Sequence, residues 1–272
     1  MRKRREASLA GRDRPEEAAK DPSFVTALAR GLDILRAFRR GDTALGNQEL
    51  AERTGLPKPT VSRLTYTLTA FGYLVYVADS GRYRLGTGVL SLGYNCLASM
   101  GIRQIASPPM QELADYTGAS VALGARDRLS MVYLECRRGN NALRLDLDVG
   151  SHLKLATSAI GRAHIVGLEE GERARLMADL MVHEGAAWPR ARAGIERALE
   201  DYRRHGFCLS LGEWRPEINA VGVPLGFRDG GEVMALNCGG PAFALTQKKL
   251  IKDIGPRLIG VARDIAAGLV SR

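Results

Sequence analysis

The sequence is poor in the residues that build covalent or metal-stabilised frameworks. Only four cysteines and four histidines occur among 272 residues. The cysteines, at positions 96, 136, 208 and 238, form no CxxC pair, and the histidines show no ligand spacing. Because each cysteine lies among apolar neighbours, we expect reduced, buried thiols and a cytoplasmic protein. We expect no metal and no cofactor; a zinc site assembled from distant residues is the alternative.

The sequence also lacks a long apolar run. No stretch approaches the roughly 18 to 20 apolar residues of a membrane helix. The basic N-terminus, residues 1–22, is not followed by the apolar stretch of a secretory signal. We therefore expect no membrane partner and a disordered, solvated tail over residues 1–22. Contact of this tail with a polyanion is the alternative.

Motifs for covalent catalysis and nucleotide hydrolysis are missing as well. Nothing resembles the GxSxG turn that presents a nucleophilic serine to a base. The glycine-rich segments GGEV and NCGGP lack the lysine and Ser/Thr of a phosphate-binding loop. The segment DYRRHG is typical of a helix C-terminus, where basic side chains are favourable. We expect no catalytic residues and no enzymatic activity.

What the sequence does have is a globular composition and an uneven excess of positive charge. Apolar residues make up 45% and charged residues 25% of the chain, and the formal net charge is +9. Residues 1–100 carry 16 Lys/Arg against 10 Asp/Glu, so most of the excess lies in the shorter N-terminal part. This distribution favours a polyanionic partner for that part.

Three amphipathic helices and a hairpin are predicted near the N-terminus. Apolar residues recur at helical spacing over residues 24–38. A short second helix is expected from Asn47, as its cap, to Gly55, and a third over residues 57–70. Two strands follow, joined at Asp79-Ser80-Gly81. This order is that of a winged helix-turn-helix domain.

The third helix presents small, polar and basic side chains on its outward face. The second helix of a helix-turn-helix enters the major groove, where small residues permit close approach. Its N-terminus attracts a phosphate, and Arg63 can bond a guanine edge or a phosphate. In the hairpin, Arg82 and Arg84 flank Tyr83 and would reach the neighbouring backbone or minor groove. The alternative is a helical core whose polar face binds nothing. The predicted DNA-binding residues are Lys58, Pro59, Thr60, Ser62, Arg63, Tyr66, Arg82 and Arg84.

Strands predominate in the second part of the chain. A helix is expected to start at Ser107, as its cap, with two prolines in its first turn and Gly118 at its end. The segments ASVALGA and LSMVYLEC predict a hairpin, and ALRLDLDVG alternates as a half-buried strand does. Three helices, three strands and a final helix over residues 246–270 complete an α+β domain on an antiparallel sheet. The predicted domains are a tail (1–22), a winged helix-turn-helix domain (23–86), a linker helix (87–106) and a second domain (107–272).

Segments from both parts resemble the IclR family of bacterial transcription regulators. ALARGLDILRAF, QELAERTGLPKPTVSRLTYTLTAFGYL and GRYRLGTGVLSLG resemble its DNA-binding half, from about residue 24 to 93. LATSAIGRAHIVGL, HGFCLSLGEWRPEINAVGVPL and GGEVMALNCGGPAFALT resemble its effector-binding half more loosely. The resemblance implies a GAF-like sensor domain for a small molecule. It also implies homodimers paired through their DNA-binding halves, and often tetramers.

The resemblance further implies a set of pocket residues on one face of the sheet. Among them Ser158, Ser210 and Asn237 could bond a carboxylate, hydroxyl or carbonyl, whereas plain core packing is the alternative for the apolar members. The positions that match the family's pocket are Leu134, Leu155, Ala156, Ser158, Cys208, Ser210, Ile218, Ala220, Asn237 and Gly239.

The pocket positions depart from the family's pattern in one direction. Ser210-Leu211-Gly212-Glu213 stands where relatives commonly show an acidic run, Asn219 where a basic residue is frequent, and Ala156 where histidine is common. The site has therefore lost polar groups. We expect a less polar ligand than that of the well-known relatives, such as an aromatic or aliphatic acid.

Together these patterns predict a homodimeric regulator, a repressor, that binds a pseudo-palindromic double-stranded DNA operator under the control of a small metabolite. Two other classes of protein stay open. A winged-helix module that contacts proteins would show no salt-sensitive DNA affinity. A metabolite-processing enzyme with an appended DNA-binding module would turn its ligand over.

Overall fold

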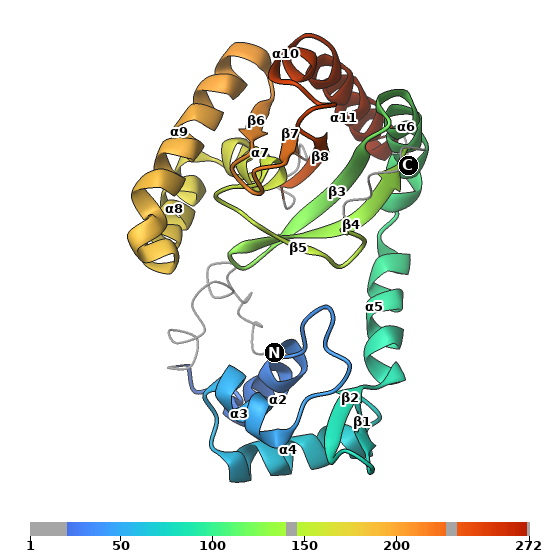
Figure 1. Ribbon diagram of the computed structural model, residues 1–272, viewed down its shortest axis with the longest axis vertical. Helices are drawn as coiled ribbons and strands as arrows, with labels where there is room; N and C mark the ends of the chain where they lie inside the picture. The colour runs from blue at the N-terminus through green and yellow to red at the C-terminus, as the bar shows by residue number, and fades with distance from the viewer. Residues whose placement is uncertain (1–20, 140–145, 227–232, 271–272) are drawn as a thin grey trace, which may run out of the picture. The chain divides into compact units, whose positions relative to one another are not determined.

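The chain divides into two compact units after Ser99 (Figure 1). The computed structural model describes residues 21–139, 146–226 and 233–270. The predicted tail lies outside the described residues, except for its last two. Among the described helices, none is both long and apolar enough to cross a membrane.

The first unit is a winged helix-turn-helix domain, as predicted. Its helices are α2 (Thr26–Arg36), α3 (Asn47–Thr54) and α4 (Lys58–Ala70). The wing pairs β1 (Leu74–Val77) with β2 (Arg82–Leu85) in antiparallel register, and Gly81 has the positive φ of 64° that the turn requires. All of these elements contribute to one small core or pack against it, and its buried members are Ile34, Ala37, Leu45, Leu50, Val61 and Leu74.

The second helix starts one residue earlier than predicted. Its N-cap is Gly46, whose N–H donates to the Glu49 carboxylate at 2.8 Å, so Asn47 is the first helical residue. The Asn47 amide instead donates to the Ser62 hydroxyl of α4 at 3.2 Å. At the other end Gly55 terminates the helix in the left-handed region, as predicted.

The helix predicted to begin with Ser107 as its cap begins six residues earlier, because its N-cap is Gly101. After α5 (Thr87–Ser99), α6 spans Ile102–Thr117 and contains Pro108 and Pro109 in its interior. Prolines interrupt helical hydrogen bonding, which is why they suggested a helix start. Apolar residues on both sides of the proline pair, Ala106 and Met110 among them, are buried in the core, and this tertiary packing overrides the local signal.

The second unit is built on a six-stranded antiparallel sheet with helices on both faces. Helices α6 and α11 (Gly255–Val270) pack on one face, and α7 (Ala159–Gly167), α8 (Glu170–Glu184) and α9 (Trp188–His205) lie over the other (Figure 1). Alternate strand residues feed two separate cores, as the period of a strand requires. The strand order is β5 (His152–Lys154), β4 (Ser130–Arg138), β3 (Ser120–Asp127), β8 (Met234–Pro241), β7 (Ile218–Leu225) and β6 (Cys208–Leu211).

The strand predicted over ALRLDLDVG is not found in its described part. Residues 146–150 lead into a turn in which the Ser151 N–H donates to the Asp148 carbonyl oxygen at 2.8 Å, and Gly150 has a φ of +83°. The short edge strand β5 follows this turn. Residues 142–145 of the segment lie outside the described chain.

The final helix begins where predicted. Thr246 caps it through a hydrogen bond from the Lys249 N–H to its hydroxyl oxygen, at 3.3 Å. The helical segment runs through α10 (Gln247–Lys249) and a short π-helical stretch, η3 (Leu250–Ile254), into α11.

Candidate DNA interface and ligand pocket

The outward face of α4 is exposed, small and basic. Pro59, Ser62, Arg63 and Tyr66 follow one another at the i, i+3, i+4 and i+7 spacing of a single helix face, and all four are exposed. Tyr66 retains 76% of its accessible surface. The opposite side of the helix, which includes Val61, is buried in the domain core. The helix therefore offers a continuous polar surface to a partner.

The N-terminal end of α4 adds to this surface. Lys58 is exposed and Thr60 is half-buried, and no side chain caps the helix. Backbone N–H groups at a helix N-terminus bind phosphate oxygens well. The side chains of Lys58 and Arg63 form no ion pair or hydrogen bond with the described part of the chain, so both cations are available to an anionic partner.

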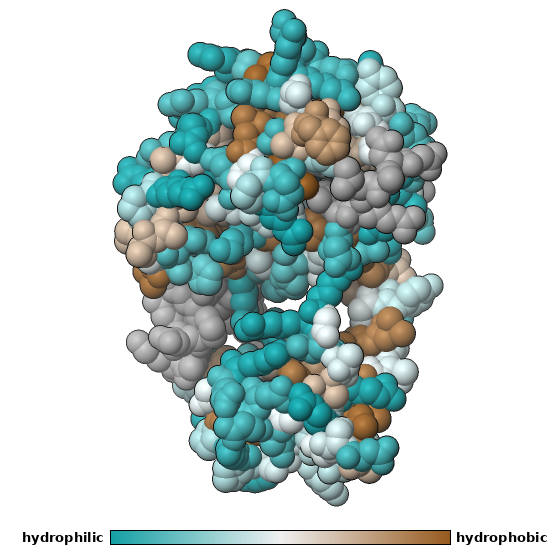
Figure 2. All heavy atoms as spheres, viewed as in Figure 1, coloured by the Kyte–Doolittle hydropathy of each residue, from teal (hydrophilic) through white to brown (hydrophobic). Residues whose placement is uncertain are grey.

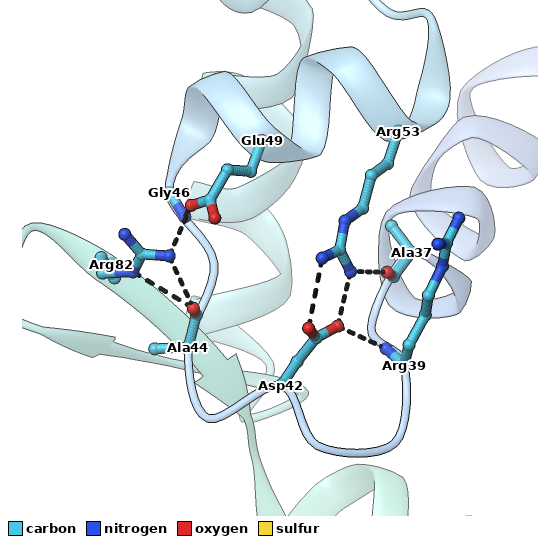
Figure 3. Close-up of polar contacts among 8 residues, drawn as sticks. All are labelled: Ala37, Arg39, Asp42, Ala44, Gly46, Glu49, Arg53 and Arg82. Atoms are coloured by element: carbon cyan, nitrogen blue, oxygen red, sulfur yellow. Dashed lines mark hydrogen bonds and ion pairs between the residues drawn. The ribbon is translucent and has the colours of Figure 1, made fainter.

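The two wing arginines differ in their surroundings. Arg84 is exposed and has no ion-pair or hydrogen-bond partner among the described residues. Arg82 is half-buried and donates to the Ala44 carbonyl oxygen and to the Glu49 carboxylate (Figure 3). Only Arg84 has the freedom of a phosphate-binding side chain.

A small hollow with an internal volume of about 20 Å³, partly open to solvent, lies on the α7 side of the sheet. Its walls come from β4, β5, β6, β7 and β8, the start of α7 and the loop after β6. The structure brings six of the predicted pocket residues together around it: Ser158, Ser210, Ile218, Ala220, Asn237 and Gly239.

The two pocket serines present hydrogen-bond acceptors to the hollow. The Ser158 hydroxyl donates to the Lys154 carbonyl oxygen at 2.6 Å, and the Ser210 hydroxyl donates to the Thr157 carbonyl oxygen at 2.7 Å. Each proton is thereby used within the protein. Ser158 Oγ also accepts from the Gly161 N–H at 3.2 Å, so only the remaining oxygen lone pairs are left for a ligand at these two positions.

Asn237 and Tyr133 form the third polar group of the hollow. Burial raises the pKa of the Tyr133 phenol, an effect only partly offset by its hydrogen bond with the Asn237 side chain. The side-chain carbonyl oxygen of Asn237 is buried and has no hydrogen-bond partner among the described residues. A buried acceptor without a partner is costly, so a ligand that donates a hydrogen bond to it gains specifically.

Four predicted pocket residues lie away from the hollow. Leu155, Ala156 and Cys208 are buried in the core beneath α7, and burial raises the pKa of the Cys208 thiol to about 12. Leu134 is the extra residue of a bulge in β4, where the register with β3 shifts. A role for these four in binding stays a prediction.

Five residues that line the hollow were not predicted: Tyr133, Leu147, Leu153, Ala159 and Trp214. Tyr133 could have been found from the alternation of its strand, because it shares a face with Met131. Trp214 is one of only two tryptophans and interrupts the polar stretch LGEWRPE, which is a signal for an apolar side chain with a role.

A buried ion pair anchors the loop that carries Trp214. Arg162 of α7 donates to the Leu209 carbonyl oxygen at 2.9 Å and pairs with Glu213, which also pairs with Arg197 of α9 at 2.5 Å. Burial alone would raise the pKa of Glu213, but the hydrogen bonds and charges of the two arginines outweigh it and lower this pKa. The guanidinium of Arg215 lies 4.4 Å from the Trp214 ring centre. The loop is thus anchored at Glu213, next to the indole.

Two family models together match most of the chain. The "IclR helix-turn-helix domain" matches residues 27–78, and "Bacterial transcriptional regulator IclR C-terminal" matches residues 94–267. The second alone covers more than half of the sequence.

Known members of the IclR family are similar to this chain over almost its full length. The chain is 37% identical to the HTH-type transcriptional regulator TsaQ1/TsaQ2 of Comamonas testosteroni, over 90% of this chain and 88% of that protein. It is 22% identical to the transcriptional repressor IclR of Escherichia coli, over 92% and 95%. The crystal structure of an IclR family transcriptional regulator from Brucella abortus is 50% identical, covers 92% of this chain and 94% of that one, and superposes with a TM-score of 0.85.

Proposed function

Because the chain belongs to the IclR family and is thus a DNA-binding transcriptional regulator with an effector-binding C-terminal domain, we propose that it is a cytoplasmic, homodimeric repressor. The operator is a pseudo-palindromic duplex, and a small organic acid in the second unit controls affinity for it. The main observation that supports DNA binding is the exposed face of α4, where the side chains of Lys58 and Arg63 are available to bind phosphate.

Binding to the DNA just upstream of its own gene, compared with a scrambled duplex at several salt concentrations, tests the operator proposal. We expect preference for the upstream fragment and an affinity that falls steeply as salt rises, because phosphate neutralisation releases counterions. Absence of binding even at low salt would contradict DNA recognition and favour a protein-contact role for the wing.

Arg63→Ala should weaken operator binding by about 1–3 kcal/mol, roughly 5- to 150-fold, if Arg63 reads a base edge. Its guanidinium is exposed on the face that enters the major groove and has no partner among the described residues. Fluorescence anisotropy on operator and scrambled duplexes would measure the loss. Base reading predicts a larger loss on the operator than on the scrambled duplex.

Arg30→Ala serves as the matched control for Arg63. It removes an equally exposed arginine from α2, outside the recognition face. An equal loss in both variants on both duplexes would mean that Arg63 contributes only general positive charge.

The walls of the hollow support a proposal for the ligand class. They are largely apolar and include the aromatic rings of Tyr133 and Trp214, and no Lys, Arg or His of the described residues lines them. A carboxylate would lie at the N-terminus of α7 and accept from backbone N–H groups of its first turn, since helix N-termini favour anions, and not from the Ser158 hydroxyl, whose proton is donated to the Lys154 carbonyl oxygen. A hydroxyl group would donate to the free oxygen of Asn237. We propose a hydroxylated aromatic or aliphatic acid.

Wild-type protein should bind 4-hydroxybenzoate at least about fivefold more tightly than benzoate, because benzoate leaves the Asn237 oxygen unpaired at about 1–3 kcal/mol. An IclR homologue from Microbacterium hydrocarbonoxydans, 21% identical, was crystallised with 4-hydroxybenzoate. Asn237→Leu should bring the two affinities together. Calorimetric titration measures both, and binding confined to short polar acids such as pyruvate would contradict the proposal.

A contact near the start of α6 supports coupling between ligand and DNA. Arg103 donates to the Leu134 carbonyl oxygen at 2.8 Å and pairs with the buried Glu135 at 2.9 Å. Leu134 follows Tyr133 of the hollow, and Arg103 lies four residues after Ser99, where the first unit ends. We propose that ligand selects one arrangement of this junction and changes operator affinity by a coupling energy of about 1–3 kcal/mol. Ligand binding with unchanged operator affinity would contradict this coupling.

Exposed apolar side chains in the first unit support the homodimer. Val25, Leu28 and Leu32 form a stripe at the start of and along α2, and Leu90, Leu92 and Tyr94 of α5 are exposed as well. Figure 2 shows apolar atoms at the surface where Figure 1 draws α5. An apolar surface of this kind marks an interaction site, and a second copy offers the same surface in a self-complementary interface.

A further inference from the structure

Backbone and side-chain hydrogen bonds join the wing to the segment before α3, in addition to the covalent connection through the chain. Leu45 and Tyr83 exchange two backbone hydrogen bonds of 2.8 Å each, so the segment before α3 pairs with β2. Beside this bridge, Arg82 donates from Nε and Nη2 to the Ala44 carbonyl oxygen, at 3.1 and 3.0 Å. Two of the three nitrogens of the Arg82 guanidinium are therefore directed at the segment before α3 (Figure 3).

Glu49 completes this junction from the first turn of α3. Its Oε2 atom accepts from Arg82 Nη2 at 2.6 Å and from the Gly46 N–H at 2.8 Å (Figure 3). The same helix end is joined to α4 by the hydrogen bond between Asn47 and Ser62. A continuous set of contacts thus runs from the wing, through Arg82 and Glu49, to the recognition helix.

The other end of α3 is held in a similar way. Arg53 donates to both carboxylate oxygens of Asp42, at 2.5 and 3.2 Å, and to the Ala37 carbonyl oxygen at 2.8 Å (Figure 3). Asp42 also accepts from the Arg39 N–H at 2.7 Å. Both ends of α3 are thus fixed to the connecting loop, and Arg82 links the wing to the N-terminal end of α3.

We propose that Arg82 is a positioning residue that holds the wing against α3 through Ala44 and Glu49, and that Arg84 is the wing arginine that contacts DNA. This inference rests on the proposed function as an operator-binding protein. It gives Glu49, an acidic residue in a DNA-binding domain, a favourable contribution to operator affinity. A surface carboxylate without such a role would instead repel the phosphates.

Glu49→Gln separates the two roles of Arg82. Glutamine keeps an oxygen that caps Gly46 but loses the charge that holds Arg82. If Arg82 is a positioning residue, Glu49→Gln and Arg82→Ala should each lower operator affinity about fivefold, and the double variant should be no weaker than the weaker single variant. If Arg82 contacts phosphate itself, Glu49→Gln should instead tighten binding, because an acid has been removed and the arginine released.

The experiment measures anisotropy at several salt concentrations with the full-length chain and a duplex selected by this protein from a random pool. We expect the slope of log affinity against log salt to stay unchanged in Glu49→Gln and Arg82→Ala, and to become shallower by about 0.9 in Arg84→Ala. A slope reduced by about 0.9 in Arg82→Ala, or wild-type affinity in Glu49→Gln, would overturn the inference. Failure of the wild type to select any duplex would instead overturn the proposed function.

Amide hydrogen exchange provides a second readout that does not depend on DNA. We expect faster amide exchange at Leu45 and Tyr83 in both Arg82→Ala and Glu49→Gln. The helices should stay as protected as in the wild type. Unchanged exchange at this bridge in both variants would mean that the arginine does not hold the wing, and would also overturn the inference.

Discussion

Leu28→Lys should convert the protein to a monomer and lower its operator affinity by at least about 100-fold. Leu28 is 63% exposed at the centre of the apolar stripe on α2. In the proposed dimer a lysine at position 28 would lie close to the same lysine of the second subunit across the two-fold axis. The like charges would repel each other, and burial of an ammonium group is costly. Loss of the dimer removes the gain from engaging two half-sites at once, which is typically 10²–10⁴-fold.

The choice of lysine makes this prediction sharp. Added positive charge by itself favours DNA binding, so a loss of affinity must come from loss of the partner. Val182→Lys is the matched control, since Val182 is 80% exposed on α8, far along the chain in the second unit. Sedimentation equilibrium and anisotropy would measure assembly and affinity. A Leu28→Lys variant that stays dimeric and binds as the wild type would contradict the proposed interface.

Sequence periodicity predicted the helices of the first unit but not which apolar residues of α2 are buried. The recurring apolar residues correctly indicated a helix, because a 3.6-residue period is a local property. The domain core, however, uses Gly31 and Ile34, while Leu28 and Leu32 are exposed. Surfaces kept for a partner have the same composition as a core. A single sequence therefore does not separate them.

The start of α6 and the walls of the hollow were harder to predict for a different reason. Pro108 and Pro109 carry a strong local signal for a helix start, and only the burial of α6 from Ile102 onward shows that it is overridden. Trp214 reaches the hollow because Glu213 beside it is paired with an arginine 51 residues away. Contacts of such long range are set by the folded sheet and leave no periodic pattern.

The hydrogen-bonding state of the pocket groups was also beyond the sequence. The sequence predicted polar contacts at Ser158, Ser210 and Asn237, but it did not say whether each would donate or accept a hydrogen bond. The structure directs both serine protons at backbone oxygens and leaves the Asn237 oxygen without a partner. This arrangement turns a general expectation of polar contacts into a specific preference for a ligand that donates a hydrogen bond.

Arg162→Met should lower the free energy of unfolding of the second unit by about 3 kcal/mol. The Arg162 side chain is only 3% exposed, and it supplies partners to the Ala156 and Leu209 carbonyl oxygens and to Glu213. Removing one member of a buried ion pair typically costs 3–5 kcal/mol, since the other groups stay buried without partners. The lower end applies because Glu213 keeps 22% exposure and its pairing with Arg197. In a unit of this size the melting temperature should fall by about 6–12 °C.

Arg192 of α9 offers a matched control for Arg162. Arg192→Met removes an exposed arginine that pairs with Glu196 on α9, and such surface pairs contribute only about 0–1 kcal/mol. Calorimetric melting of both variants should therefore separate them clearly, and equal shifts would mean that the buried pair has no special importance.

Because the folded state lowers the pKa of Glu213 below its ordinary 4.5, the stability that this carboxylate contributes is complete above that pH and is lost as the pH falls through the folded pKa. The difference in unfolding free energy between wild type and Glu213→Gln should accordingly be constant near neutral pH and shrink only in acid. A difference that stayed the same at the lowest pH would show that the ionised carboxylate is not the source of this stability.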